Sequence, residues 1–159
     1  MLNPIDTEAV IRDGGATGRF PDEMHPAAAW WIAACFVVTL RANQLVVAHD
    51  GQPATAKFFD LLCQGAINAQ HYACRVLDLD VADEDELVMA MKDADRVPGM
   101  RVTTVGDQVT ITLYDRAGVP LAERPSLYLI RRMIAEDRIP LPVNTECKGH
   151  VLPYAEAAR

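Results

Sequence analysis

The chain has 159 residues, half of them hydrophobic, and 22 acidic residues against 15 lysines and arginines give a formal net charge of −7. This length suits one domain with a substantial core, and the acidic balance argues against binding to nucleic acid or to a membrane surface, which needs a basic face. Cys35, Cys63 and Cys74 lie in apolar segments and no zinc-binding spacing occurs, so we expect packed, reduced thiols in a cytoplasmic protein.

The N-terminal segment predicts a short strand, a glycine-rich loop and a long apolar helix. Residues 8–12 suit a strand, and the glycines of residues 14–18 favour a plain turn over a phosphate-binding loop, because no helix follows directly. The helix is expected to begin at Pro26, a residue that suits the first helical position, and to extend to about Ala42. Its apolar run over residues 27–38 is too short for a membrane span, which needs about 20 residues.

This helix is unusual because apolar residues cover every side of it. A helix that lies on a sheet normally keeps one polar face. The outer face is therefore expected to be buried, either under the long C-terminal segment or against a partner chain. The residues that would form such an interface are Trp30, Trp31 and Phe36.

Residues 45–59 combine a buried strand, a tight turn and the start of a helix. Adjacent valines favour the strand, Asp50 and Gly51 interrupt it, and Pro53 can begin a helix without the loss of a hydrogen bond. In α/β domains such a turn lies at the carboxyl edge of the sheet, where ligands usually bind. This turn is therefore the first candidate for a functional site.

The next segments continue an alternation of helices and strands. A helix over residues 53–69 followed by a strand over residues 73–79 completes a parallel βαβ unit. Asp83 and Glu86 have the spacing of a capping box, which predicts a helix that runs to about Ala94.

The remaining segments predict a hairpin, one more helix and an irregular end. Valine, threonine and isoleucine alternate through residues 100–105 and 108–114, a pattern typical of paired strands, and a helix is expected over residues 125–135. The chain as a whole predicts a single three-layer α/β/α domain with a mixed, mostly parallel sheet of about four strands. This domain spans residues 1–140, and an irregular C-terminal tail spans residues 141–159.

Four short segments resemble, in the same order and at about the same spacing, the motifs of one known family. They are Ile11-Arg12-Asp13-Gly14, VVAHDGQPAT at 46–55, RVTTV at 101–105 and LYDRAGVPL at 113–121. Over about residues 8–136 the chain is similar to the first domain of the α-D-phosphohexomutases, the phosphoglucomutase and phosphomannomutase family. The resemblance implies the α/β fold of that domain, although none of the motifs is intact.

The sequence departs from the family pattern at the positions that carry the family's chemistry. The resemblance places the family's phosphoserine at Val105, which has no nucleophilic atom. His49 and Gln52 stand where the family has arginines that attract phosphate, and the family's aspartate-rich metal loop does not occur in the sequence. The chain by itself is therefore expected to have no catalytic residue, no metal site and no cofactor.

A surviving anion site would combine Arg12, His49 and either Thr103 or Thr104 with backbone N–H groups at the start of the following helix. The expected function is that of a non-catalytic module, which acts through protein–protein association, as a homo-oligomer or with another chain, or through binding of a sugar phosphate. The alternative is a divergent phosphotransferase component of carbohydrate metabolism, of the phosphoglucomutase and phosphomannomutase type, that another chain completes.

Overall fold

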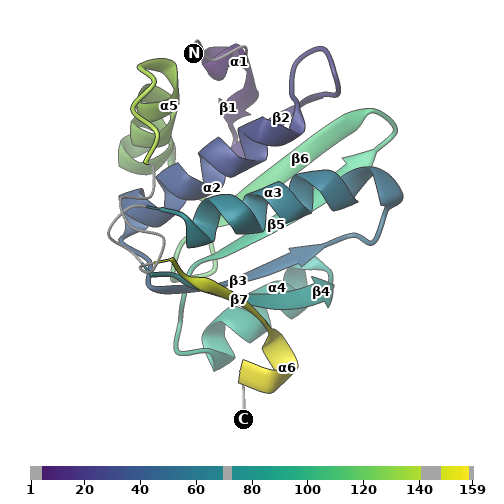
Figure 1. The fold of residues 1–159 in the computed structure, drawn as a ribbon, viewed down its shortest axis with the longest axis vertical. Helices are drawn as coiled ribbons and strands as arrows, with labels where there is room; N and C mark the ends of the chain where they lie inside the picture. The colour runs from purple at the N-terminus through teal and green to yellow at the C-terminus, as the bar shows by residue number, and fades with distance from the viewer. Residues whose placement is uncertain (1–4, 70–72, 141–147, 158–159) are drawn as a thin grey trace.

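The computed structural model describes residues 5–69, 73–140 and 148–157, and within them seven strands form one mixed sheet (Figure 1). The strands in chain order are β1 Ile11–Arg12, β2 Gly15–Arg19, β3 Gln44–His49, β4 Arg75–Val81, β5 Gly99–Val105, β6 Gln108–Tyr114 and β7 His150–Pro153. Across the sheet they are ordered β1-β2-β6-β5-β3-β4-β7. The pairs β3–β4, β3–β5 and β4–β7 are parallel, and the pairs β1–β2, β2–β6 and β5–β6 are antiparallel. The predicted mixed sheet is confirmed, but the expected number of about four strands was too low.

Helices cover both faces of this sheet, which confirms the predicted three-layer α/β/α architecture. The helices α2 Pro26–Leu40 and α3 Ala56–Ile67 lie side by side on one face, and α5 Tyr128–Ala135 packs beside α2 (Figure 1). The helix α4 Glu84–Asp93 covers β3 and β5 on the other face. The described residues also form two short α-helices, α1 Thr7–Val10 next to β1 and α6 Tyr154–Ala157 next to β4, a 3₁₀ turn at Pro53–Thr55 before α3 and a π-helical turn at Glu123–Leu127 before α5. None of the described helices is long and apolar enough to cross a membrane.

Two hydrophobic clusters form the core because successive side chains of a strand point to opposite faces of the sheet. Val47, Met100 and Val102 belong to the larger cluster, under α2, α3 and α5. Val46 and Tyr114 belong to the smaller cluster, under α4. This alternation decides on which face each candidate site residue lies.

The long apolar helix α2 is enclosed by three elements of the same chain. The sheet lies beneath it, α3 runs along one flank and α5 contacts another. Phe36 is completely buried in this core, whereas Trp30 and Trp31 are half-buried and pack against it. Phe36 is therefore not available for the predicted interface with a partner chain, whereas for the partly exposed Trp30 and Trp31 the interface stays a prediction.

Two segments that were expected to be irregular are strands instead. The predicted glycine loop at residues 14–18 overlaps β2, which pairs along its length with β6. Part of the predicted irregular tail forms β7 and α6, and β7 extends the sheet beyond β4. In both cases the strand is held by a partner that lies far away in the sequence, so local composition does not indicate it. Residues 141–147 of that tail lie outside the described residues.

Candidate functional site

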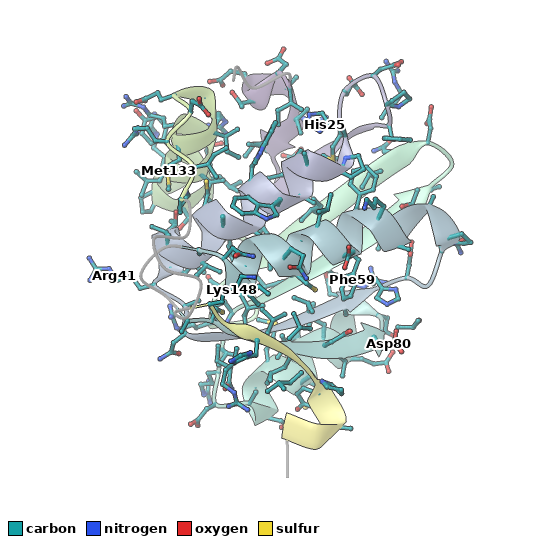
Figure 2. All side chains as sticks on the ribbon, viewed as in Figure 1. His25, Arg41, Phe59, Asp80, Met133 and Lys148 are labelled. Atoms are coloured by element: carbon teal, nitrogen blue, oxygen red, sulfur yellow. The ribbon has the colours of Figure 1, made fainter. Side chains whose placement is uncertain are left out.

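The candidate site lies at the carboxyl edge of the sheet, where the parallel strands β3, β4 and β5 end and α3 and α4 begin. Its central segment is the turn from His49 to Gln52, which connects β3 to a short 3₁₀ turn, Pro53–Thr55, in front of α3. Gly51 has a φ of 80°, a left-handed conformation that favours glycine. Phe59 of α3 and Asp80 of β4 flank this edge (Figure 2).

His49 is held in one orientation by two hydrogen bonds. Its Nδ1 accepts the backbone N–H of Gly51 at 3.0 Å, so the ring proton lies on Nε2, which donates to the Asp80 carboxylate at 2.9 Å. The ring also packs on Phe59, with 4.4 Å between the ring centroids. His49 therefore orders the turn and links β3 to the end of β4.

The Asp50 carboxylate accepts several hydrogen bonds from the surrounding backbone and side chains. Its Oδ1 accepts the N–H of Gln52 at 3.0 Å, and its Oδ2 accepts the N–H of Thr104 at 2.7 Å. Burial alone would raise the pKa of Asp50, but these bonds, together with one from the Thr55 hydroxyl, lower it below its usual value. The Asp50 carboxylate therefore lies at the start of the helical segment and accepts N–H groups that could otherwise donate to a bound phosphate.

The four residues of the predicted anion site do not form one cluster. Thr104 lies beside the turn, and its hydroxyl and that of Thr55 are 2.6 Å apart. Thr103 points to the opposite face of the sheet, because side chains alternate along β5. Arg12 lies on β1, four strand spacings or roughly 19 Å from β3, and donates to the Ala9 carbonyl and the Asp13 carboxylate. The structure therefore brings together only His49 and Thr104 of the predicted set.

Asp80 and Thr55 are site residues that sequence reasoning missed. Thr55 follows Pro53 in the first turn of the helical segment, so its place at the helix start could have been found from the local sequence. Asp80 lies 31 residues after its partner His49, and only the pairing of β3 with β4 brings the two side chains together.

Asp50→Ala is expected to lower the free energy of unfolding by about 1–3 kcal/mol, because the N–H groups of Gln52 and Thr104 lose their acceptor. Since the pKa of Asp50 is lowered in the folded state, its contribution is present above the unfolded pKa of about 3.9 and is lost as the pH falls through the folded pKa. Urea unfolding at pH 7 and at pH 3 measures both effects. Asp60→Ala, on the exposed side of α3, is the matched control, and an equal loss in both variants would contradict the role of Asp50.

The described residues of the turn and of the hairpin tip, 49–55 and 103–108, include no serine and no cysteine. Val105, where the resemblance placed the phosphoserine, is 80% exposed at the tip of the β5–β6 hairpin. Cys35, Cys63 and Cys74 are buried free thiols, as predicted, and burial raises the pKa of Cys35 and Cys74 to about 12. Among the described residues, no group of three histidine, cysteine, aspartate or glutamate side chains is placed to hold a metal ion.

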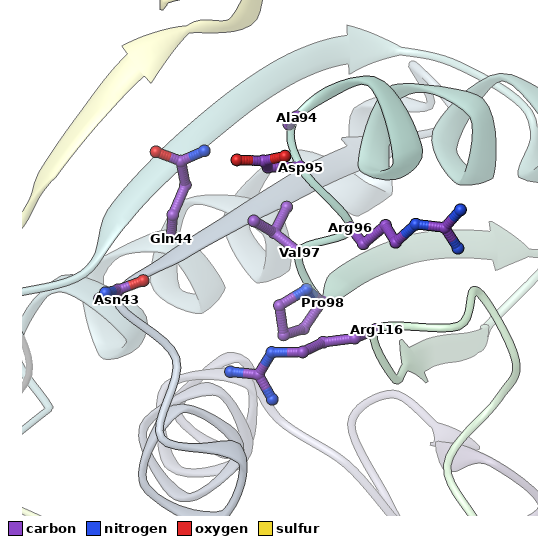
Figure 3. A pocket seen from close by; sticks show the side chains of 8 residues that line it. All are labelled: Asn43, Gln44, Ala94, Asp95, Arg96, Val97, Pro98 and Arg116. Carbon is purple, nitrogen blue, oxygen red and sulfur yellow. The ribbon is translucent and has the colours of Figure 1, made fainter.

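A hollow of about 370 Å³ lies at the opposite, amino edge of the sheet. Arg96 and Arg116 extend away from each other on either side of Pro98 (Figure 3). Arg116 donates at 2.9 Å to the Leu40 carbonyl at the end of α2, and Asp95 adds a negative charge to the same hollow. The two guanidinium groups therefore do not converge on one anion.

Comparison with known proteins finds similarity in structure only. No family model matches the sequence, and no curated protein matches it either. The fold matches a phosphoglucomutase/phosphomannomutase family protein from Burkholderia thailandensis with a TM-score of 0.74 and 16% identity, over 94% of this chain and 33% of that chain. It also matches a protein assigned as a phosphomannomutase from Thermus thermophilus with a TM-score of 0.70 and 18% identity, over 99% of this chain and 35% of that chain.

These matches confirm, at the level of the fold, the resemblance that the sequence motifs indicated. The chain spans about a third of the length of both solved structures, consistent with a single domain. At this level of identity the likeness concerns the fold alone, so residue roles depend on the geometry of this chain.

Proposed function

We propose that this chain is a non-catalytic module with the fold of a phosphohexomutase domain, and that it acts by binding another protein chain at its carboxyl edge. The observation that carries the proposal is the chemistry of the β5–β6 hairpin tip. Where the resemblance calls for a phosphorylated serine, the tip presents Val105, an exposed apolar side chain that cannot carry a phosphoryl group.

The hydrogen bonds of the turn argue against this edge as a site for phosphate or a sugar phosphate. The N–H groups of Gly51, Gln52 and Thr104 already donate to the side chains of His49 and Asp50. A phosphate would have to displace these side chains and would lie close to two carboxylates, those of Asp50 and Asp80. Both effects disfavour an anion, because like charges repel and the displaced groups would lose their partners.

The exposed apolar residues of the same edge favour a protein partner. Phe20, Val81 and Val105 are three of the seven large hydrophobic side chains that the described part of the chain leaves exposed. Phe20 follows the end of β2 and its backbone N–H donates to Asp107 in the hairpin turn, so it lies next to the tip. The chain spans about a third of the length of the matched structures, and we propose that a separate chain covers this apolar edge.

Val105→Asp is expected to weaken capture of the partner by about tenfold or more, because a charged side chain would replace an apolar one in the proposed interface. The measurement is recovery from a native extract on immobilised wild-type protein and variants, quantified by mass spectrometry. Val119→Asp is the matched control, since this exposed valine lies in the loop after β6, at the amino edge. Equal recovery of every bound protein on all three baits would contradict the proposal.

Two further measurements, an activity assay of the captured complex and a thermal-shift assay of the chain, would assign a different function. If the captured complex interconverts hexose phosphates, the chain is a phosphotransferase component that another chain completes, a role favoured by its one-third coverage of the matched structures. If millimolar phosphate or hexose phosphate raises the Tm of the wild-type protein and His49→Ala removes the shift, the edge binds a sugar phosphate instead.

A further inference from the structure

The negative charge of this protein is concentrated in one segment. Residues 78–95 contain eight acidic residues and one lysine, a formal charge of −7, whereas the other residues contain 14 acidic and 14 basic residues and are neutral as a whole. This segment comprises the end of β4 and the whole of α4. Four of the eight acidic residues, Glu84, Asp85, Glu86 and Asp93, belong to α4, and with Lys92 they give this helix a formal charge of −3.

A shallow groove of about 450 Å³ runs along this acidic helix. Leu79, Met89, Ala90 and Tyr154 provide its apolar lining. The Tyr154 hydroxyl donates to the Ala90 carbonyl at 3.3 Å, which fixes one wall of the groove. Met89 is 58% exposed, an unusual position for a large apolar side chain on a helix surface.

Asp85, Met89 and Asp93 follow one another at intervals of four residues, so they form one ridge along α4. The ridge spans about 12 Å and places a carboxylate one helical turn before and one turn after the apolar side chain. Neither aspartate forms an ion pair among the described residues, and Glu86 adds a third carboxylate to the groove. Within the described residues, the Asp85 and Asp93 carboxylates of this ridge therefore have no basic side chain as a partner.

We propose that the α4 groove, defined by Leu79, Asp85, Glu86, Met89, Ala90, Asp93 and Tyr154, docks a basic amphipathic helix of another protein. The partner helix would place an apolar side chain against Met89 and Tyr154, with a lysine or arginine one turn before it and one turn after it. This spacing mirrors the ridge of Asp85, Met89 and Asp93, so both basic groups would meet a carboxylate when the apolar contact forms. The groove is separate from the hairpin tip at Val105, and the proposal does not depend on the proposed function.

The test uses the full chain and a synthetic alanine-based helical peptide in which a leucine has lysines four residues before and four residues after it. A permuted peptide of the same composition carries both lysines on the side opposite the leucine. Fluorescence anisotropy of labelled peptides is expected to show about tenfold tighter binding of the matched peptide. Higher salt should weaken this binding, because exposed charges are screened. Equal affinities for the two peptides, or no binding of either, would overturn the proposal.

Variants of the protein then separate the groove from general electrostatic attraction. Met89→Gln should weaken binding of the matched peptide by about tenfold, because the apolar contact is lost while the charge is unchanged. Val119→Gln removes an exposed apolar side chain at another place and should leave the affinity as in the wild type. Urea unfolding of both variants checks that the fold is intact. An unchanged affinity of Met89→Gln overturns the proposal, as would self-association of the protein that Met89→Gln abolishes, since the occupant would then be a second copy.

Discussion

Gly65→Val is expected to destabilise the fold by about 3 kcal/mol or more, a large part of the total stability of a domain of this size. Gly65 of α3 packs directly against the backbone of α2 at Trp30. A β-carbon at this position would lie 2.8 Å from the Trp30 Cα and closer still to the Trp30 carbonyl oxygen. Because these atoms belong to the backbone, a rotamer change cannot relieve the contact and the two helices would have to separate. Chemical unfolding followed by circular dichroism measures the loss.

Gln64→Val is the matched control for this variant. It introduces the same β-branched residue at the neighbouring position of α3, but on a half-exposed side of the helix. A change there is expected to stay within about 0.5 kcal/mol. If Gln64→Val lowered the stability as much as Gly65→Val, helix propensity and not the close approach of α2 and α3 would be responsible.

Arg131→Ala is expected to destabilise the fold by about 3 kcal/mol, because it removes the guanidinium that joins α5 to the N-terminal strand. Arg131 is 9% exposed, and its Nε and Nη2 donate to the Ile11 carbonyl at 3.1 and 2.8 Å. Its Nη1 also donates to the Glu123 carboxylate at 3.0 Å. In the variant the Ile11 carbonyl would remain buried without these donors. Urea unfolding of wild type and variant provides the measurement.

Arg138→Ala provides the comparison for Arg131→Ala. Arg138 is mainly exposed and contacts Glu136 at 3.2 Å, so its removal should change the stability by less than about 1 kcal/mol. The hydrogen bond from Arg131 lowers the pKa of Glu123, so the Glu123 contribution is present above about pH 4.3 and decreases in acid. This contribution is small because Glu123 is largely exposed. Equal losses in Arg131→Ala and Arg138→Ala would contradict the structural role of the buried guanidinium.

The parts of the fold that the sequence predicted well are those with short-range signals. The capping box of Asp83 and Glu86 is present in α4, with both reciprocal hydrogen bonds. The expected hairpin is formed by β5 and β6, and the stretch from β3 to α3 has the predicted strand, turn and helix. In each case residues within a few positions of one another decide the local conformation.

The candidate site was predicted less well because it depends on which face of the sheet each side chain reaches. Arg12 and Thr103 have the right residue types for an anion site, but the strand order and the alternation along β5 keep them away from His49. The hydrogen bond between His49 and Asp80 requires the pairing of β3 with β4. Sequence patterns report neither a strand order nor a register between distant segments.

The sequence by itself determined the layered α/β architecture, the turn at Asp50 and Gly51, and the absence of a nucleophile at Val105. Only the tertiary structure decided that Asp50 accepts the N–H groups of the turn, that α3 and α5 enclose Phe36, and that β2 and β7 extend the sheet. The physical reason is the range of the interactions. Turns and caps form between neighbouring residues, whereas burial and strand pairing join residues that are distant in the chain.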